Sequence, residues 1–371
     1  MCTLALPSLY RTVDISIHKH NRSWFRWMCD PCPDPDEMIE MEEDGKVGEE
    51  QFNLATRQIC FITAVLKNPS LARHVVSFTW TYQRPDFDAL PNVEGGEKSI
   101  WEVFGLLQNV RDLDISFFLG YHEWSKGLTA PPPPLFPHAS RIRIGGNATY
   151  AIFRSILSNP SKLISLDLDN IQAFRQIKDG EGMKHTLWEA PETEDEDGWP
   201  LLRHAGPMYG HLNPLLGQFT NLQHLHLHVV GQQHYDNQGW PEDREEKRYA
   251  ELAAFISSLK ATLRTLVFDH GSYHEYFEAP VWDDDSDTSL RELDCDVEDL
   301  MRPMDAWFMK HILPVLGGTA WDVLEKLEIN GVGGADQSYE QRLIDEALEL
   351  GEVKLRMQLS PKVDLKWEHT L

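Results

Sequence analysis

The chain has 371 residues, of which 34 are basic and 59 acidic, so its formal net charge is −25 at pH 7. This charge repels phosphate backbones and anionic lipid headgroups, which argues against nucleic-acid binding and against docking on a membrane surface. The remaining electrostatic expectation is that this acidic chain binds a protein with a basic surface. The five cysteines are an odd number, spread thinly along the chain, and this usage is typical of a reducing compartment.

The N-terminal segment and the hydropathy pattern predict an intracellular protein, in the cytoplasm or the nucleus. The first residues, MCTLALPSLYRTVD, carry no basic leader, and Pro7 interrupts their short apolar run. No run along the chain approaches the roughly 20 apolar residues of a membrane span.

One pattern recurs along most of the chain: an apolar anchor, two residues, a second anchor, one residue and a third anchor. The clear copies begin at Val110, Ala139, Leu163, Leu222, Leu263, Leu290 and Leu324. An earlier copy starts at Val75, and Val13-x-Ile15 opens the series. This is the L-x-x-L-x-L core of a leucine-rich repeat, in which each copy supplies one short parallel strand.

The segments between the copies show the apolar spacing of helices and are often followed by Pro or Gly. We predict helices over Leu54–Lys67, Ser99–Gln108, Thr149–Ser158, Arg244–Leu259, Asp305–Leu316 and Tyr339–Leu350. Gly351 is the predicted stop of the last of these.

Together, the copies and helices predict one α/β domain over residues 1–371. Its architecture would be an irregular leucine-rich-repeat solenoid, with parallel strands on the concave face and helices on the convex face. A doubly wound α/β sheet also alternates strands and helices, but its strands would be apolar on both faces. Two acidic insertions are expected to be mobile: 30–50, which is also Pro-rich, and 179–200. They contain too few apolar residues for burial to offset the conformational entropy that is lost on ordering.

Three segments resemble a known family. ALPSLYRTVDIS at 5–16 resembles the segment directly after the F-box in many fungal F-box/leucine-rich-repeat proteins. NPSLARHVVSFTWTY at 68–82 and LFPHASRIRI at 135–144 are similar to repeats of the same proteins. The resemblance spans nearly the whole chain and rests mostly on repeat anchors.

The resemblance implies a substrate-recognition subunit in a ubiquitin-ligase pathway. In that family the F-box binds the Skp-type adaptor of a cullin ubiquitin ligase, and the repeats hold a protein substrate. Met1 stands where the F-box would already have ended, so no adaptor-binding residue has a counterpart in this sequence. A Skp-type adaptor and a cullin are therefore expected as partners only if an F-box exists upstream.

The stretch NLQHLHLHVVG, residues 221–231, places His224, His226 and His228 at every second position. On a strand these positions share one face. The leucines between them are repeat anchors that turn inward, so the histidines are expected to line the concave face.

Aligning the copies by their anchors predicts two rows of side chains across this face. The first row reads Asp114, Arg143, Asp167, His226, Val267, Asp294 and Glu328. The second row reads Ser116, Gly145, Asp169, His228, Asp269, Asp296 and Asn330. We expect a protein partner with a basic surface to bind the charged members of these rows and His224.

The alternative is a metal-binding protein or a metal-dependent hydrolase that uses His226 and His228 with Asp169 or Asp269. His224 and His228 are about 13 Å apart along an extended strand, which is too far for three imidazoles to share one ion.

Cys29-Asp-Pro-Cys32 is a weaker candidate for a metal site. A single C-x-x-C motif also occurs where two reduced cysteines lie in a loop and bind no metal. The sequence has no G-x-S-x-G, no phosphate-binding loop and no H-E-x-x-H. We therefore expect neither enzymatic activity nor a cofactor.

Overall fold

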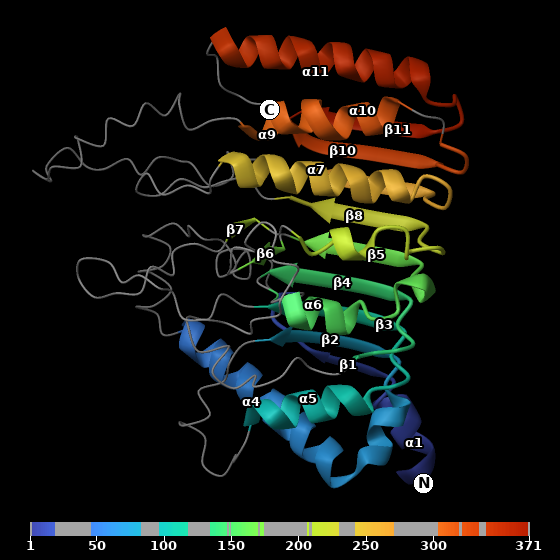
Figure 1. The fold of residues 1–371 in the computed structure, drawn as a ribbon. Coiled ribbons are helices and arrows are strands. Elements are labelled where there is room, and N and C mark those ends of the chain that lie inside the picture. The colour runs from blue at the N-terminus through green and yellow to red at the C-terminus, as the bar shows by residue number, and fades with distance from the viewer. Residues whose placement is uncertain are drawn as a thin grey trace, which may run out of the picture. The chain divides into compact units, whose positions relative to one another are not determined.

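The computed structural model describes residues 2–18, 46–82, 96–117, 134–146, 148, 150–169, 171–173, 206–207, 210–229, 242–270, 303–318, 321–333 and 339–369. The chain is α/β and forms two compact units, each with parallel strands and helices (Figure 1). Unit 1 is Met1–His211 with Gln218–Leu222, and unit 2 is Leu212–Gly217 with Gln223–Leu371. The single domain over 1–371 stays a prediction. No described helix combines the length and apolar content that crossing a membrane requires.

In unit 1, five strands pair in chain order and in parallel. They are β1 (Thr12–Ile15), β2 (Ser77–Tyr82), β3 (Asp112–Phe117), β4 (Arg141–Gly146) and β5 (Ser165–Asp169). The helices are α1 (Cys2–Leu9), α4 (Lys46–Lys67), α5 (Gly96–Leu106) and α6 (Tyr150–Ile156), with 3-10 turns η1 (Pro69–His74) and η4 (Pro160–Lys162). A short antiparallel ribbon joins β6 (Gln172–Ala173) and β7 (Gly206–Pro207).

In unit 2, four strands again pair in chain order and in parallel. They are β8 (His224–His228), β9 (Thr265–Asp269), β10 (Lys326–Val332) and β11 (Asp364–His369). The helices are α7 (Glu242–Ser258), α9 (Pro303–Trp307), the π-helical η8 (Phe308–Ile312), α10 (Leu313–Gly317) and α11 (Tyr339–Gln358), with the 3-10 turn η5 (Asn213–Leu215).

The repeat anchors build the core because alternate residues of a strand point to opposite faces. In unit 1 the middle anchors lie opposite one another in register, as Val13, Phe78, Leu113, Ile142 and Leu166. The third anchors form a second apolar row one step further along, as Ile15, Trp80, Ile115, Ile144 and Leu168. All ten side chains are buried.

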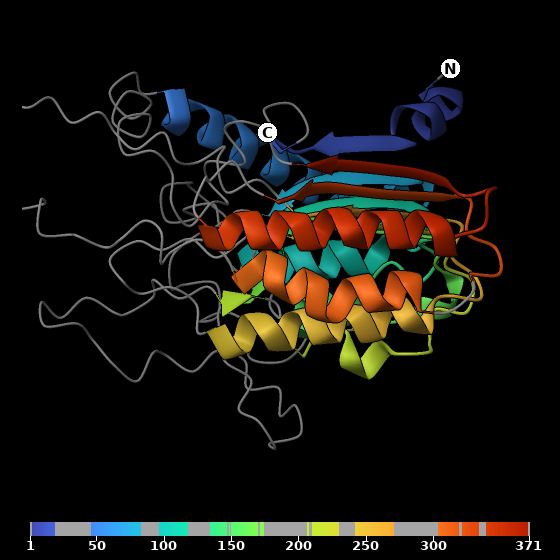
Figure 2. The same ribbon diagram turned by 90° about the horizontal axis from the view of Figure 1, so that it is seen from above.

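Aromatic side chains join the helices to these rows. Phe104 of α5 meets Phe78 and Trp80 edge-on, with ring centroids 5.5 Å apart in both pairs. Phe61 of α4 packs on the same two rings at 5.9 and 6.2 Å. Figure 2 shows α5 lying along one side of the strands, so the apolar face is the one that a helix covers.

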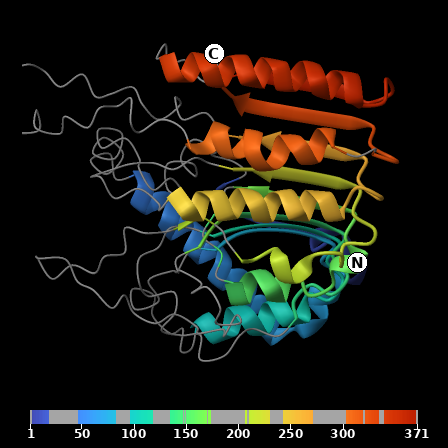
Figure 3. The same ribbon diagram turned by 45° about the horizontal axis from the view of Figure 1, so that its top comes forward.

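Unit 2 repeats this construction. Leu225, Leu266 and Leu327 lie in one row and are at most 1% exposed. Phe308 of η8 packs on Phe268 of β9 with ring centroids 5.4 Å apart and on Trp367 of β11 at 6.0 Å. The helices of this unit lie along one side of its strands, as Figures 2 and 3 show.

One predicted copy does not take its expected place. β10 pairs directly with β9, with Glu328 opposite Val267 and Asn330 opposite Asp269. The predicted rows placed Asp294 and Asp296 between these strands, and that placement is wrong. Residues 290–296 themselves lie outside the described part of the chain.

The C-terminal region also differs from the sequence prediction. Gly351 does not end the last helix, because α11 continues to Gln358. A side chain at Gly351 would collide with Leu313 of α10, so this glycine permits close packing of the two helices instead of stopping one. Strand β11 was not predicted.

The acidic insertions fall almost wholly outside the described residues. Residues 46–50 of the first insertion belong to helix α4, which begins at Lys46. The remainder of 30–50 and all of 179–200 lie outside the described part of the chain.

Candidate functional site: the polar face of unit 1

The strands of unit 1 carry a second face, opposite the apolar rows, that is rich in polar side chains. Its members, here called the polar face, are Asp14, Ser16, His18, Thr79, Thr81, Asp114, Ser116, Arg143, Gly145, Asp167 and Asp169. The pairing places Asp114, Arg143 and Asp167 side by side, and Ser116, Gly145 and Asp169 likewise. The two rows in this unit therefore lie in the register that the anchor alignment predicts.

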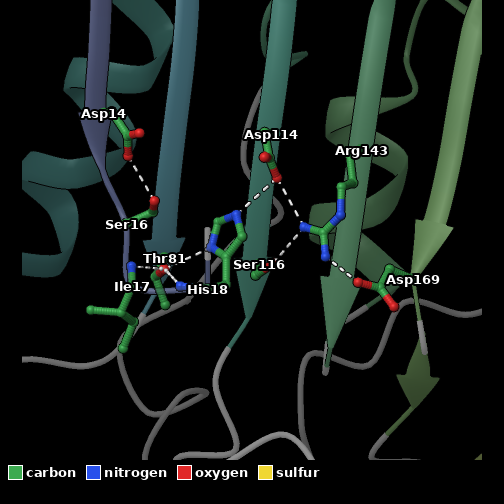
Figure 4. Close-up of polar contacts among 9 residues, drawn as sticks. All are labelled: Asp14, Ser16, Ile17, His18, Thr81, Asp114, Ser116, Arg143 and Asp169. Carbon is green, nitrogen blue, oxygen red and sulfur yellow. Dashed lines mark hydrogen bonds and ion pairs between the residues drawn. The ribbon is translucent and has the colours of Figure 1, made fainter. Parts of the chain in front are cut away.

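At one end of the polar face, His18 joins β1 to the two strands beyond it (Figure 4). Its Nδ1 atom lies 2.8 Å from Thr81 Oγ1 of β2, and its Nε2 atom lies 2.9 Å from Asp114 Oδ1 of β3. The imidazole is only 2% exposed as a side chain. It therefore bridges groups that are 63 and 96 residues away in the sequence.

The hydrogen bonds around Thr81 suit a His18 imidazole that carries its proton on Nε2. Thr81 Oγ1 accepts a hydrogen bond from the backbone N–H of Ile17 at 2.9 Å, which leaves its own O–H free to donate to Nδ1. Nδ1 is then the acceptor, and the N–H at Nε2 donates to Asp114. Each polar atom in this chain of contacts thus has a role that suits its chemistry.

Helix α4 holds the ends of β1 and β2 from the other side. Gln58 donates through Nε2 to the carbonyl of Thr81 at 2.7 Å, and Arg57 donates through Nη2 to the carbonyl of Asp14 at 2.6 Å. Gln58 is 1% exposed, so its amide is a buried structural contact. The helix thereby fixes the strands that carry Thr81 and His18.

Arg143 occupies the centre of the polar face and connects three strands. Its Nη1 atom donates to Asp114 Oδ1 and to Ser116 Oγ, both at 2.9 Å. Its Nη2 atom donates to Asp169 Oδ2 (Figure 4). The planar guanidinium has the donor geometry for two carboxylates at once, which a lysine lacks.

This network shifts the pKa values of Asp114 and Arg143 toward their charged forms. Burial, the largest influence on Asp114, disfavours its charge, but the hydrogen bond from His18 and the nearby charge on Arg143 lower its pKa below the usual value. Burial also acts against the charge on Arg143, yet the carboxylates of Asp169, Asp114 and Asp167 raise its pKa above the usual value.

Gly145 provides the space in which the guanidinium lies. A Cβ atom at this position would be 2.8 Å from Ser116 Oγ and 3.3 Å from Arg143 Nη2. Any side chain there would push on the network from within its own strand.

The arrangement Thr81–His18–Asp114 has the order of a hydroxyl, a base and an acid, as in nucleophilic catalysis. Thr81, however, is 0% exposed and His18 is 4% exposed, so a substrate has no access to the hydroxyl. Thr81 Oγ1 also already accepts a hydrogen bond from Ile17. In this structure the Thr81 hydroxyl is therefore a buried member of a hydrogen-bond network.

The histidine row lies in unit 2, where His224, His226 and His228 share one face of β8 while Leu225 and Leu227 are buried. His226 lies opposite Val267, and His228 lies opposite Asp269 with Nε2 4.0 Å from Oδ2. The register across β8 and β9 is the predicted one. At 4.0 Å this contact is an ion pair only when the imidazole is protonated.

Further along the same face, Glu328 of β10 lies between two lysines. Lys326 Nζ is 2.5 Å from Oε2 of the carboxylate, and Lys366 Nζ of β11 is 3.2 Å from Oε1. The pKa of Glu328 is lowered to about 2. The hydrogen bond from Lys326 has the largest effect, burial acts in the opposite direction, and the hydrogen bond from Lys366 lowers the pKa further.

The predicted metal ligands do not form a donor set within the part of the chain that the structure describes. No group of three His, Cys, Asp or Glu side chains suited to a metal ion occurs among the described residues. His226 faces Val267 on the neighbouring strand, which supplies no donor. Cys29 and Cys32 lie outside the described residues.

The sequence analysis gave His18 no place among the candidate site residues. The signal was present, because extending Val13-x-Ile15 by the strand period puts Asp14, Ser16 and His18 on the polar face. The prediction aligned its rows only from Asp114 onward and so left out β1 and β2.

Comparisons of the chain with protein-family models, with curated proteins and with solved structures found no match. The polar face is therefore interpreted from its own geometry.

Proposed function

We propose that the chain is a protein-binding leucine-rich-repeat module whose polar face receives a protein substrate. The observation that carries this proposal is the ordered network of His18, Asp114, Arg143 and Asp169 on strand residues. Side chains held on strands by mutual hydrogen bonds lose little entropy when a partner binds, which favours recognition. Since the nucleophile-like group Thr81 is inaccessible, binding suits this surface better than catalysis.

Recurring local structure supports the repeat architecture. The first anchor of several copies closes a tight turn by donating its N–H three residues back, at Val75, Val110, Ala139, Leu163 and Leu222. At the start of β3, the backbone N–H groups of Arg111 and Asp112 both donate to the carbonyl of Val76 in the preceding copy. The same paired contact recurs in unit 2, where Arg264 and Thr265 both donate to Gln223.

Charge supports a basic partner. In unit 1 the polar face carries four carboxylates, Asp14, Asp114, Asp167 and Asp169, against the guanidinium of Arg143. The whole chain carries a formal net charge of −25. Potentials of this sign steer cationic surfaces toward the protein and repel anionic ones.

The ubiquitin-ligase part of the proposal rests on the resemblance to fungal F-box/leucine-rich-repeat proteins. In that setting the polar face would hold the substrate, and an F-box encoded before Met1 would bind the Skp-type adaptor. Sequencing of full-length transcripts tests this part. An F-box in frame upstream of Met1 supports it, whereas a stop codon directly upstream limits the proposal to protein binding.

Site-specific photo-crosslinking in cell extract tests the binding surface. A photoreactive amino acid replaces Arg141, whose side chain is 63% exposed beside the polar face, or Lys366, which is 47% exposed. Matched probes replace exposed helix residues in the same units, Glu102 of α5 and Lys310 of η8. We expect each strand position to crosslink a protein that the helix position of the same unit does not. Equal crosslinking from the helix positions, or none from the strands, contradicts the proposal.

A further inference from the structure

Helix α11 carries two apolar faces. The first is buried and consists of Leu348, Gly351 and Leu355, and Leu359 directly after the helix is buried as well. It packs on α10, where Leu313 approaches Gly351 and the Leu355 side chain lies 3.9 Å from the Cβ position of Gly317.

The second apolar face points away from this contact. Leu350, Val353 and Met357 are 60%, 54% and 81% exposed. Spaced three and then four residues apart, they form one continuous stripe on the side of α11 opposite the buried face. The terminal element of a stacked array normally presents a polar outer face to water. This stripe, here called the α11 stripe, departs from that rule.

The strand that follows α11 is open at the same end of unit 2. Leu365 of β11 continues the apolar row of Leu225, Leu266 and Leu327, which are at most 1% exposed, yet Leu365 is only half-buried. Among the described strands β11 pairs with β10 alone. Figures 1 and 3 show α11 and β11 together at this end of the unit. An open strand edge beside exposed apolar side chains is a site of further pairing.

The charges beside the stripe identify what covers it. Acidic side chains lie at and before the N-terminal end of the stripe, at Glu346, Glu349 and Glu352, and basic ones lie toward its C-terminal end, at Lys354 and Arg356. Within the helix, Arg356 also pairs with Glu352. A uniformly basic or acidic partner would match only one half. A second α11 in antiparallel orientation matches both, because the acidic half of each copy then meets the basic half of the other.

We propose that this end of unit 2 is a self-association surface, on which two copies of the chain pack α11 against α11 in antiparallel orientation about a two-fold axis. The α11 stripes of the two copies cover each other. Glu349 and Arg356 lie two turns apart on the same side of the helix, so pairing centred on Val353 brings Glu349 of one copy beside Arg356 of the other. The formal charge of −25 opposes self-association elsewhere, whereas this helix segment is nearly balanced.

Sedimentation velocity of the full chain tests the proposal. Protein concentrations from about 1 to about 100 μM cover the dissociation constants of typical dimers. We expect a monomer–dimer equilibrium in the wild type. The double variant Val353→Glu/Met357→Glu should raise the dissociation constant at least about tenfold. Val323→Glu is the matched control, since Val323 is an exposed apolar residue of the same unit outside the stripe. Circular dichroism and the thermal midpoint establish that all variants are folded.

A charge swap tests the orientation. Glu349→Arg and Arg356→Glu each weaken the dimer, and the two together restore it if the helices are antiparallel. A wild type that remains monomeric at all concentrations overturns the proposal. The proposal is also overturned if the stripe variant and the Val323→Glu control weaken the dimer equally. The same holds if the charge swap fails to restore association.

Discussion

The guanidinium of Arg143 lies where a side chain at Gly145 would begin. A Cβ atom at Gly145 would be 3.3 and 3.4 Å from the two terminal nitrogens of Arg143, and 2.8 Å from Ser116 Oγ. The three residues come from β3 and β4, two neighbouring strands of the polar face. The absence of a side chain at Gly145 is thus part of how Arg143 reaches Asp114 and Asp169 at once.

Replacing Gly145 by alanine is expected to destabilise the protein by about 1–3 kcal/mol, the usual cost of overpacking. The added methyl group displaces Ser116 Oγ and presses on Arg143. Denaturant unfolding measures the change. Gly105→Ala in α5 is the control, because no atom lies within 4 Å of its Cβ position and alanine favours a helix. If Gly145→Ala is as well tolerated as Gly105→Ala, the packing argument is wrong.

Arg143→Met should lower the free energy of unfolding by about 3 kcal/mol, because it leaves two partly buried carboxylates without their counterion. Adding Asp114→Asn and Asp169→Asn to this variant should recover part of the loss, which a mutant cycle measures. Arg141→Met serves as the control on the same strand. Its pair with Asp112 is exposed, so its loss is expected to cost less than about 1 kcal/mol. Equal losses for the two arginines would contradict the central role of Arg143.

Thr81→Val should cost about 1–3 kcal/mol, because it removes the hydroxyl that the N–H of Ile17 and Nδ1 of His18 both use in a buried setting. Thr81→Ser keeps the hydroxyl and is expected to retain most of the stability. Hydrogen exchange of the Ile17 amide gives a local readout. Faster exchange in the valine variant alone supports the hydrogen-bond assignment, and unchanged exchange argues against it.

Glu328 makes stability depend on pH in a defined direction. Its pKa is about 2 in the folded protein against an ordinary 4.5, so the folded state binds fewer protons than the unfolded state between these values. The contribution of Glu328 is present above about pH 4.5 and is lost as the pH falls toward 2. The stability difference between wild type and Glu328→Gln should therefore be larger at pH 6 than at pH 3, by urea unfolding. A difference that does not change with pH would show that the lysine contacts contribute nothing.

The order of the strands within each unit and the direction of their side chains could be predicted from the sequence. A strand has a period of two, so the anchors at Leu113 and Ile115 must face the core while Asp114 and Ser116 lie on the opposite face of the strand. The same alternation exists at Val363, Leu365 and Trp367, and it would have predicted β11 had it been followed to the end of the chain. The order of the copies shows the limit of this pattern, since β10 pairs directly with β9 although a predicted copy at Leu290 comes between them in the sequence.

What the sequence by itself determined is therefore local: which residues are anchors, which face each one takes, and that Asp114, Arg143 and Asp167 share a row. Only the tertiary structure decided the contacts. His18 reaches Asp114 across 96 residues. Arg143 donates to Asp169, which lies two residues beyond the row that Arg143 occupies, because the guanidinium lies along its strand over Gly145. Gly351 continues a helix because Leu313 packs against it. Such contacts depend on which elements become neighbours and which rotamers then fit, and periodicity carries no information about either.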